Sequence, residues 1–253
     1  MLLWNTAGAT ADEKAPEEAN RSDDGRFRHE FKLVSQEFAY AGVMGILRAE
    51  AALAELHPAR RVQSVYLDTP NGRALEENLA GISHREKVRF RWYGSETTGV
   101  PGRLECKVRH NLYGWKHLVQ VEQPLAVEGC NRFQFVRQLE ALVEADWRDR
   151  LRGLQPAQWI RYEREYLGSI DERLRVTVDR KLVVSDQRLR ARLCPRFATP
   201  TGRLLIVEIK CSAENYRAAQ RLVNRLPMQV GKCSKFVLAS SPAEGPMPAL
   251  LWT

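Results

Sequence analysis

Three short acid–base pairs carry the clearest chemistry in this sequence. Each places a glutamate two residues before a lysine, at Glu30 and Lys32, Glu105 and Lys107, and Glu208 and Lys210. Residues i and i+2 share one face of a β-strand, so each pair would present a carboxylate and an ammonium side by side. Carboxylate oxygens bind hard cations such as Mg²⁺ or Mn²⁺, while ammonium groups neutralise phosphate oxygens. The pairs therefore indicate a site for metal-complexed phosphates.

Arginines and lysines repeat elsewhere with the same two-residue spacing. Lys87, Arg89 and Arg91 alternate with apolar residues, and Arg173 and Arg175 do the same further along the chain. A strand with one face in water gives a similar pattern, but such faces usually mix small polar residues and both signs of charge. Like charges on neighbouring strands also repel, by up to about 1 kcal/mol per cross-strand pair. We therefore expect these cations to converge on a bound anion.

The elements that must position these groups are mostly strands. Alternation of polar and apolar residues predicts strands at 26–34, 61–68, 82–93, 102–110, 113–123, 158–167, 171–179 and 203–211, with a weaker candidate at 182–190. Apolar periodicity predicts helices at 36–56, 131–150, 213–226 and 233–240. Many strands with few helices between them favour an α+β fold. We expect an antiparallel β-barrel, or tunnel, with a polar, basic interior and helices packed on the outside.

Charge is distributed unevenly along the chain. The 253 residues carry a formal net charge of +8, but residues 1–25 hold six acids and two bases, a net of −4, which leaves +12 on the remainder. A charge of +12 on the residues after position 25 favours a polyanionic partner. Five scattered cysteines argue against a zinc site or a disulfide framework, and no apolar run could span a membrane. We expect a cytoplasmic protein with a disordered acidic tail at 1–25, one domain at 26–241 and a C-terminal tail at 242–253.

Eight segments occur together in the order typical of one known family. They are Arg28-His29-Glu30-Phe31-Lys32, SVYLDT at 64–69, KVRFRWYG at 87–94, LECK at 104–107, YER at 162–164, RVTVD at 175–179, VEIK at 207–210 and KCSKF at 232–236. Over roughly residues 26–240 the chain resembles the VTC domain, the polyphosphate-polymerase branch of the CYTH-like triphosphate tunnel metalloenzymes. The CYTH branch opens with E-x-E-x-K, whereas Arg28 replaces the first glutamate here, as it does in VTC domains.

The resemblance implies roles for individual residues. Catalysis would depend on Arg89, Arg91, Lys107 and Glu208. The phosphates would be held by Lys32, Arg89, Arg91, Lys107, Lys116, Arg164, Arg175, Lys210, Lys232 and Lys235. A divalent metal, Mn²⁺ or Mg²⁺, would bind to Glu208, with Glu30 and Glu105 as helpers. For the cations the alternative interpretation is an ordinary charged surface, and for the carboxylates a structural salt bridge.

The reaction that the resemblance implies is in-line phosphoryl transfer from ATP. With a polyphosphate chain as acceptor the protein would be an ATP-dependent polymerase, which is the leading hypothesis. With water as acceptor it would be a triphosphatase acting on inorganic tripolyphosphate or a nucleotide. A third alternative is a module that binds polyphosphate without catalysing any reaction. Nucleic acid is disfavoured as a partner because its binding proteins usually present cations and aromatics on a convex face. We expect ATP and polyphosphate or tripolyphosphate as partners, and membrane association only through another protein.

Overall fold

The structure is a computed structural model that describes residues 29–50, 52–111, 113–196, 198–200, 203–231 and 233–239. The tails expected at 1–25 and 242–253 lie outside these residues, as do Arg28 and Lys232. Within the described part of the chain, no helix has both the length and the apolarity needed to cross a membrane.

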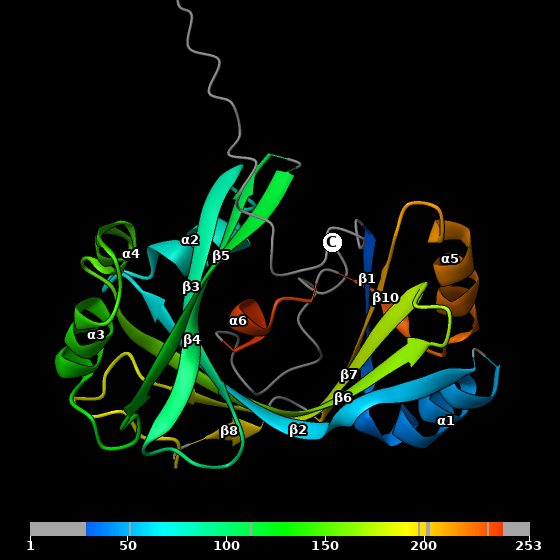
Figure 1. The fold of residues 1–253 in the computed structure, drawn as a ribbon, viewed down its shortest axis with the longest axis horizontal. Coiled ribbons are helices and arrows are strands. Elements are labelled where there is room, and N and C mark those ends of the chain that lie inside the picture. Colours follow the sequence, from blue (N-terminus) through cyan, green and yellow to red (C-terminus); the bar gives the residue numbers. More distant parts are fainter. Residues whose placement is uncertain are drawn as a thin grey trace, which may run out of the picture.

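One antiparallel sheet organises the described chain. Its strand order is β10–β1–β9–β7–β6–β2–β3–β4–β5, and β8 pairs with β7. The strands are β1 (His29–Gln36), β2 (Leu53–Asp68), β3 (His84–Tyr93), β4 (Val100–His110), β5 (Tyr113–Leu125), β6 (Gln155–Ser169), β7 (Leu174–Asp186), β8 (Thr199–Pro200), β9 (Leu204–Cys211) and β10 (Gln229–Val230). The sheet bends strongly, so that β3, β4 and β5 form one wall and β1, β7 and β10 face them across the concave side (Figure 1).

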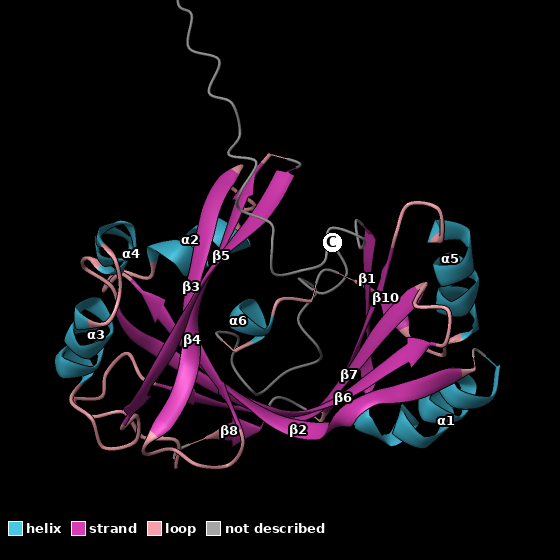
Figure 2. Cartoon of the chain, in the orientation of Figure 1, coloured by secondary structure: helices cyan, strands magenta, loops and turns pink. Residues whose placement is uncertain are grey.

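Helices cover both outer sides of this bent sheet, and one lies inside it. They are the 3-10 turn η1 (Glu37–Ala39), α1 (Tyr40–Gly45), the π-helical turn η2 (Ile46–Glu50), α2 (Arg73–Leu79), α3 (Arg132–Ala141), α4 (Ala145–Leu151), α5 (Tyr216–Arg225) and α6 (Lys235–Leu238). Helices α3 and α4 back the β3–β5 wall, α1 and α5 back the opposite wall, and α6 sits between the walls (Figure 2). The prediction that helices pack outside is therefore wrong for α6.

The apolar faces of the alternating strands bury themselves under the outer helices. On one wall Phe90 packs edge-on against Phe135 of α3, with ring centroids 5.9 Å apart, and Trp92 is buried beside it. On the other wall Val207 of β9 and Leu222 of α5 belong to a second buried cluster. Because side chains alternate across a strand, burying these faces outward directs the charged faces toward the concave side. Two buried clusters therefore lie behind the walls of the hollow. A third, which includes Tyr66, Ile160 and Phe236, packs around α6 on the concave side, with α2 against it.

The helix predicted at 36–56 ends earlier than expected. Helical residues stop at 50 and β2 begins at Leu53, pairing with β6 from Leu53 opposite Ser169 onward. Residues 54–61 of β2 are exposed on both faces. A strand without a buried face has no two-residue apolar alternation, which is the signal that predicts strands from sequence. The first half of β2 therefore carries no local signal from which a strand could be predicted.

Other boundaries also differ from the prediction. The helix expected at 131–150 is two helices, because Glu144 adopts an extended conformation between α3 and α4. The strands expected at 171–179 and 182–190 are one strand, β7, which ends at Asp186. Helix α2 was not predicted: it has seven residues and none of them is buried, so it lacks apolar periodicity.

Asp68, whose buried carboxylate belongs to the SVYLDT segment at 64–69, has a role in the fold that its hydrogen bonds reveal. Its Oδ1 accepts hydrogen bonds from the backbone N–H groups of Thr69 at 2.7 Å and Ala74 at 2.8 Å, and its Oδ2 accepts one from Leu75 at 3.1 Å. The first N–H groups of a helix have no partner within the helix, so a carboxylate in this place satisfies them. Asp68 thus joins β2 to α2 and has a structural role.

Candidate functional site

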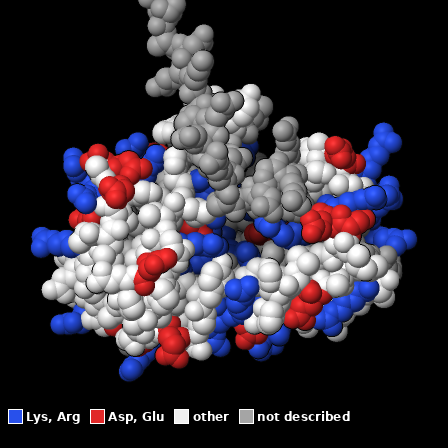
Figure 3. Space-filling view, in the orientation of Figure 1, with Lys and Arg blue, Asp and Glu red and all other residues white. Residues whose placement is uncertain are grey.

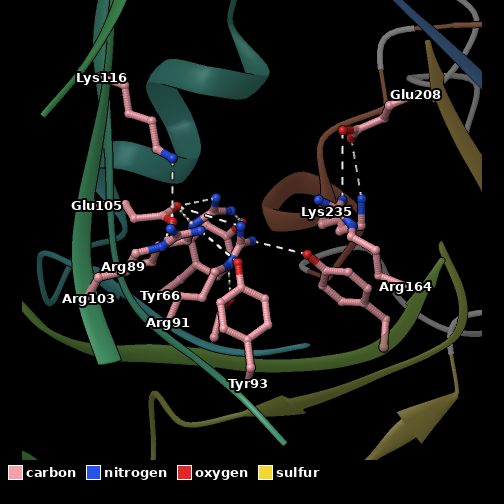
Figure 4. Close-up of polar contacts among 12 residues, drawn as sticks. Tyr66, Arg89, Arg91, Tyr93, Arg103, Glu105, Lys116, Arg164, Glu208 and Lys235 are labelled. Atoms are coloured by element: carbon pink, nitrogen blue, oxygen red, sulfur yellow. Dashed lines mark hydrogen bonds and ion pairs between the residues drawn. The ribbon is translucent and has the colours of Figure 1, made fainter. Parts of the chain in front are cut away.

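A buried carboxylate surrounded by cations occupies the β3–β5 wall. Arg89 donates a hydrogen bond from Nε to Oε2 of Glu105 at 2.6 Å, and Arg103 Nε lies 2.7 Å from Oε1. Lys116 Nζ is 3.4 Å from Oε1, and Arg91 Nη1 is 3.7 Å from Oε2. The Glu105 side chain is only 2% exposed. Figure 4 shows these four cations converging on one carboxylate from three neighbouring strands.

The charges in this cluster do not balance. Burial opposes ionisation of Glu105, but Arg89, Arg91, Lys116 and Arg103 together hold its pKa below the usual range. One carboxylate cannot neutralise four cations, so the cluster keeps an excess of positive charge. A fold that concentrates uncompensated cations in this way is organised to receive further negative charge.

Hydroxyl groups from β2 and β6 fix the two central arginines. Arg89 Nη1 donates to the Tyr66 hydroxyl at 2.6 Å. Arg91 Nε donates to Ser64 Oγ at 3.1 Å, and its Nη2 donates to the Tyr162 hydroxyl at 3.1 Å. A guanidinium held at several of its N–H groups loses little further freedom when it binds an anion, which favours both affinity and orientation.

Three lysines stand directly opposite one another on adjacent strands. Lys107 of β4 pairs in register with Lys87 of β3 on one side and with Lys116 of β5 on the other. Burial, followed by the charges of Lys107 and Lys32, lowers the pKa of Lys87 to about 7. Burial also lowers the pKa of Lys116 to about 8, despite the nearby Glu105. We call Lys87, Lys107 and Lys116 the lysine row.

The opposite wall contributes to the same electrostatic environment. Enclosure within the hollow, followed by the charge of Lys32 on β1, lowers the pKa of Lys107, although the Lys107 side chain remains accessible to solvent. Lys32 likewise lowers the pKa of Lys87. Cations on β1 and on β3–β4 are therefore close enough to repel each other across the concave side. Lysines and arginines gather in the hollow between the two halves of the molecule (Figure 3).

A second cluster of buried charges lies where β6, β7, β9 and α6 meet. Arg164 makes a bidentate contact with Asp179, with Nε to Oδ1 at 2.6 Å and Nη2 to Oδ2 at 2.7 Å. Lys235 Nζ is 2.6 Å from Asp179 Oδ2 and 3.5 Å from Glu208 Oε1. Burial opposes ionisation of Asp179, but Arg164 and Lys235 keep its pKa below the usual range. Lys235 and Arg164 approach Glu208 from below in Figure 4.

Tyr162 joins the two clusters. Its hydroxyl accepts the hydrogen bond from Arg91, while its ring lies 5.3 Å from the Arg164 guanidinium carbon and 5.0 Å from Lys235 Nζ. Cations near an aromatic face are stabilised without any loss of their charge. Tyr162 therefore brings two sets of cations together without neutralising their charge.

The remaining predicted residues lie along the β1–β9–β7 side. Lys32 Nζ is 3.6 Å from Glu30 Oε2 and 3.9 Å from Glu208 Oε1. Two residues beyond Glu208 on β9, Lys210 lies in register with Glu30 of β1 and with Arg175 of β7. The predicted residues therefore fall into neighbouring groups on one concave surface, apart from Lys232, which is outside the described residues.

The three glutamates predicted as metal ligands are not grouped together. Among the described residues no set of three or more His, Cys, Asp or Glu side chains is placed to hold a metal ion. Glu105 takes part in the Arg89 cluster, with close contacts to both of its oxygens. Lys235, Arg164 and Lys32 lie between 3.5 and 3.9 Å from the carboxylate of Glu208. A divalent ion that also binds substrate phosphates needs only one or two carboxylates, so Glu208 and Glu30 fit such an ion and Glu105 does not.

Several members of these clusters have no role in the prediction from sequence. Asp179 orients Arg164 and Lys235, and its position on the charged face of 175–179 was the available signal. Lys87 and Arg103 share the spacing of the predicted cations but were not assigned. The hydroxyls of Tyr66 and Tyr162 could not be assigned, because their partners come from strands that are distant in sequence.

Comparison with known proteins agrees with this geometry. The VTC domain family matches residues 27–241. This chain belongs to the VTC family. The resemblance noted in the sequence is thereby confirmed, and membership implies triphosphate or polyphosphate chemistry. Members of the family typically use divalent metals. Comparison with curated proteins finds no match.

Solved structures similar to this VTC domain include two bacterial proteins, both described provisionally as adenylate cyclases. The protein from Vibrio parahaemolyticus has a TM-score of 0.48 and 10% identity, over 85% of this chain and 99% of the other. The protein from Bacillus halodurans has a TM-score of 0.49 and 9% identity, over 81% and 92%. The family assignment stands on the VTC match alone.

Proposed function

We propose that this VTC domain catalyses metal-dependent phosphoryl transfer and synthesises polyphosphate from ATP, with a linear phosphate chain held in a tunnel that the bent sheet encloses. The VTC family includes the catalytic domains of polyphosphate polymerases, which supports this assignment. The concave surface supplies the cations that such a chain requires, on both walls of the sheet.

The lysine row is the observation that carries the proposal. Lys87, Lys107 and Lys116 are cross-strand neighbours, and like charges directly opposite each other destabilise a sheet. The pKa of each of the three is lowered, first by enclosure within the hollow and then, for Lys87 and Lys107, by neighbouring cations. A bound polyanion would remove this repulsion and restore the ordinary pKa values. A chain of phosphates matches the row because it carries a negative charge at each repeat.

In the proposed reaction the protein acts through position and charge. Arg89 and Arg91 are held by Glu105, Tyr66, and the Ser64 and Tyr162 hydroxyls, so their N–H groups are already oriented before substrate arrives. Phosphoryl transfer needs charge stabilisation on the transferring group more than it needs a protein nucleophile. Preorganised guanidinium groups in a partly dehydrated site supply that stabilisation.

A divalent metal would be held by Glu208, with Glu30 as its neighbour. When bound, the metal would help neutralise the phosphate oxygens. Burial opposes ionisation of Glu208, but Lys235, Lys32 and Arg164 keep its pKa well below the usual range. Glu208 is therefore ionised at neutral pH and able to act as a ligand.

Product analysis tests whether a polyphosphate chain or water accepts the phosphoryl group from ATP. The purified protein is incubated with ATP and Mn²⁺, and long-chain polyphosphate is measured alongside free phosphate. We expect polyphosphate to accumulate. Release of free phosphate alone would favour a triphosphatase, and tight polyphosphate binding without turnover would favour a non-catalytic binding module.

The phosphate site is tested independently by Lys107→Glu. This reversal removes a repulsive pair on each side, so the free energy of unfolding should stay the same or rise by up to about 1 kcal/mol. Tripolyphosphate affinity, measured by calorimetry, should fall by at least about tenfold. The matched control is Arg217→Glu, an exposed charge reversal on the outer helix α5. Unchanged tripolyphosphate binding by Lys107→Glu would contradict the proposed site.

A further inference from the structure

Two tyrosines and an arginine from three strands form an aromatic cluster next to the phosphate site. The Arg60 guanidinium carbon on β2 lies 5.3 Å from the ring centroid of Tyr93 on β3 and 5.2 Å from that of Tyr166 on β6. Tyr93 is 39% exposed, and Arg60 is also exposed. The Arg60 guanidinium therefore lies close to two aromatic rings while remaining open to solvent.

Arg60 has no counter-ion in the described part of the chain. Its close neighbours among the described residues are the two rings, and no described carboxylate lies within ion-pair distance of it. In the sheet it stands directly opposite Arg164, another cation of the site. An exposed guanidinium that faces a like charge and aromatic rings attracts a ligand that is both anionic and planar.

The aromatic cluster is connected to the phosphate site by one side chain. Arg103 donates from Nη2 to the Tyr93 hydroxyl at 2.7 Å, while its Nε lies 2.7 Å from Glu105 Oε1. Tyr93 also follows Arg89 and Arg91 at two-residue spacing on β3, so all three share the concave face. In Figure 4 the Tyr93 ring stands beside the arginines, with its hydroxyl directed toward them. A ligand with its phosphates on Arg89 and Arg91 could thus reach the Tyr93 ring.

We propose that Tyr93, Tyr166 and Arg60 form the binding site for the nucleobase of the nucleotide whose triphosphate lies in the hollow. This inference rests on the proposed function and extends it to the part of the substrate that carries no phosphate. A phosphate chain has no apolar surface and gains nothing from tyrosine rings. A nucleobase stacks on tyrosine and guanidinium planes without needing base-specific hydrogen bonds.

The proposal predicts different behaviour for tripolyphosphate and ATP, which both carry a chain of three phosphates. Tripolyphosphate and ATP should contact the same cations, but only ATP should contact the aromatic cluster. Calorimetric titration with Mn²⁺ present is carried out with both ligands for the wild type, Tyr93→Leu, Tyr166→Leu and Tyr93→Phe. Tyr113→Leu is the control, because Tyr113 is 77% exposed and lies at the opposite end of the β3–β5 wall.

We expect each leucine variant to lose about tenfold in ATP affinity, or ~1.4 kcal/mol, with tripolyphosphate affinity changed by less than about twofold. Tyr93→Phe keeps the ring but loses the hydrogen bond from Arg103, so it should retain ATP affinity. Equal losses for both ligands would show that the tyrosines only support the phosphate cations, and would overturn the nucleobase site. No loss for either ligand would overturn it as well.

Failure of the nucleobase site can be distinguished from failure of the proposed function. If the wild type binds both ligands but the leucine variants lose no ATP affinity relative to tripolyphosphate, the phosphate site stands and the nucleobase site is wrong. If the wild type binds neither ligand, the proposed function fails and the nucleobase site fails with it. A folded state for every variant is checked by circular dichroism before titration.

Discussion

At the scale of single residues, Glu105 shows how an acidic side chain can serve an anion site. Its carboxylate is almost fully buried and meets Arg89, Arg91, Arg103 and Lys116. Oε1 accepts no hydrogen bond, but four cations already surround the carboxylate, so a metal ion there would add to their mutual repulsion. Its contacts instead keep four mutually repelling cations together when no substrate is bound. The E-x-K spacing is shared with Glu208, but the surroundings give the two carboxylates different roles.

The first prediction follows from this role of Glu105. Glu105→Gln removes the counter-ion and should lower the free energy of unfolding by roughly 3 kcal/mol, because breaking a buried ion pair leaves charges uncompensated. Tripolyphosphate should recover much of this loss, since it supplies new negative charge. Chemical denaturation with and without tripolyphosphate measures both effects.

The control for Glu105→Gln is Glu122→Gln, which changes an exposed glutamate on β5. It should leave stability within about 0.5 kcal/mol of the wild type. Mn²⁺ affinity should be nearly unchanged in Glu105→Gln. A large loss of Mn²⁺ binding in Glu105→Gln would indicate that Glu105 is a metal ligand, and would contradict its role as an internal counter-ion.

The second prediction concerns Lys87, whose pKa is lowered to about 7 by burial and then by neighbouring lysines. Between pH 7 and 10 the unfolded chain holds a proton on this lysine that the folded, ligand-free protein has lost. Stability from this group therefore rises with pH across that window. Phosphate binding raises the pKa again, so binding near pH 8 should take up a proton.

Proton uptake is measured by calorimetry in buffers of different ionisation enthalpy. In Lys87→Gln, uptake on tripolyphosphate binding at pH 8 should fall by a substantial fraction of one proton relative to the wild type. Any protonation of the ligand itself is common to both proteins and cancels in the comparison. Lys116, with a pKa of about 8, accounts for part of the uptake that remains. Identical uptake in both proteins would exclude Lys87 from the site.

At the scale of elements, α6 is unusual because it has four residues and lies on the concave side. A helix this short is not stable alone, so its position depends on tertiary contacts. Phe236 is buried and stacks on Tyr66, with centroids 5.0 Å apart. Ser234, just before the helix, accepts a hydrogen bond from Lys87 at 2.9 Å. These contacts place Lys235 between Asp179 and Glu208.

The third prediction is that Phe236→Ala affects both stability and binding. Loss of the buried ring should lower the free energy of unfolding by about 3–5 kcal/mol. Because Lys235 would lose its position, tripolyphosphate affinity should also fall, by about tenfold, in conditions where the variant remains folded. Phe133→Ala on α3 is the control, since Phe133 is 61% exposed. Denaturation and calorimetry together test the prediction, and wild-type affinity in folded Phe236→Ala would contradict it.

The elements also show which parts of the fold and the site can be predicted from the sequence and which cannot. Strands with one apolar and one charged face, such as β3, β4 and β9, were predicted within a few residues because their alternation is a local property. The first half of β2 has no buried face, so it carried no such signal. The pairing of Arg164 with Asp179 and the separation of Glu105 from Glu208 depend on register between strands distant in sequence. Local patterns cannot supply that register.

At the scale of the whole molecule, the site is divided between two walls of one sheet. The lysine row and the Glu105 cluster belong to β3–β5, while Lys32 and Glu208 belong to β1 and β9. A single orthophosphate can reach only part of this surface. A longer phosphate chain can contact both walls at once, so its affinity should grow faster than its charge.

The fourth prediction is a steep dependence of stabilisation on phosphate chain length. A ligand at 100 times its dissociation constant stabilises the folded state by about 2.7 kcal/mol, which raises the melting temperature by several degrees. At constant ionic strength, tripolyphosphate should produce such a shift, while orthophosphate should shift the melting temperature no more than sulfate does. Thermal denaturation over a series from orthophosphate to long-chain polyphosphate measures the effect. Equal shifts for orthophosphate and tripolyphosphate would mean that the cations act as separate anion sites, and the two walls would then have no common ligand.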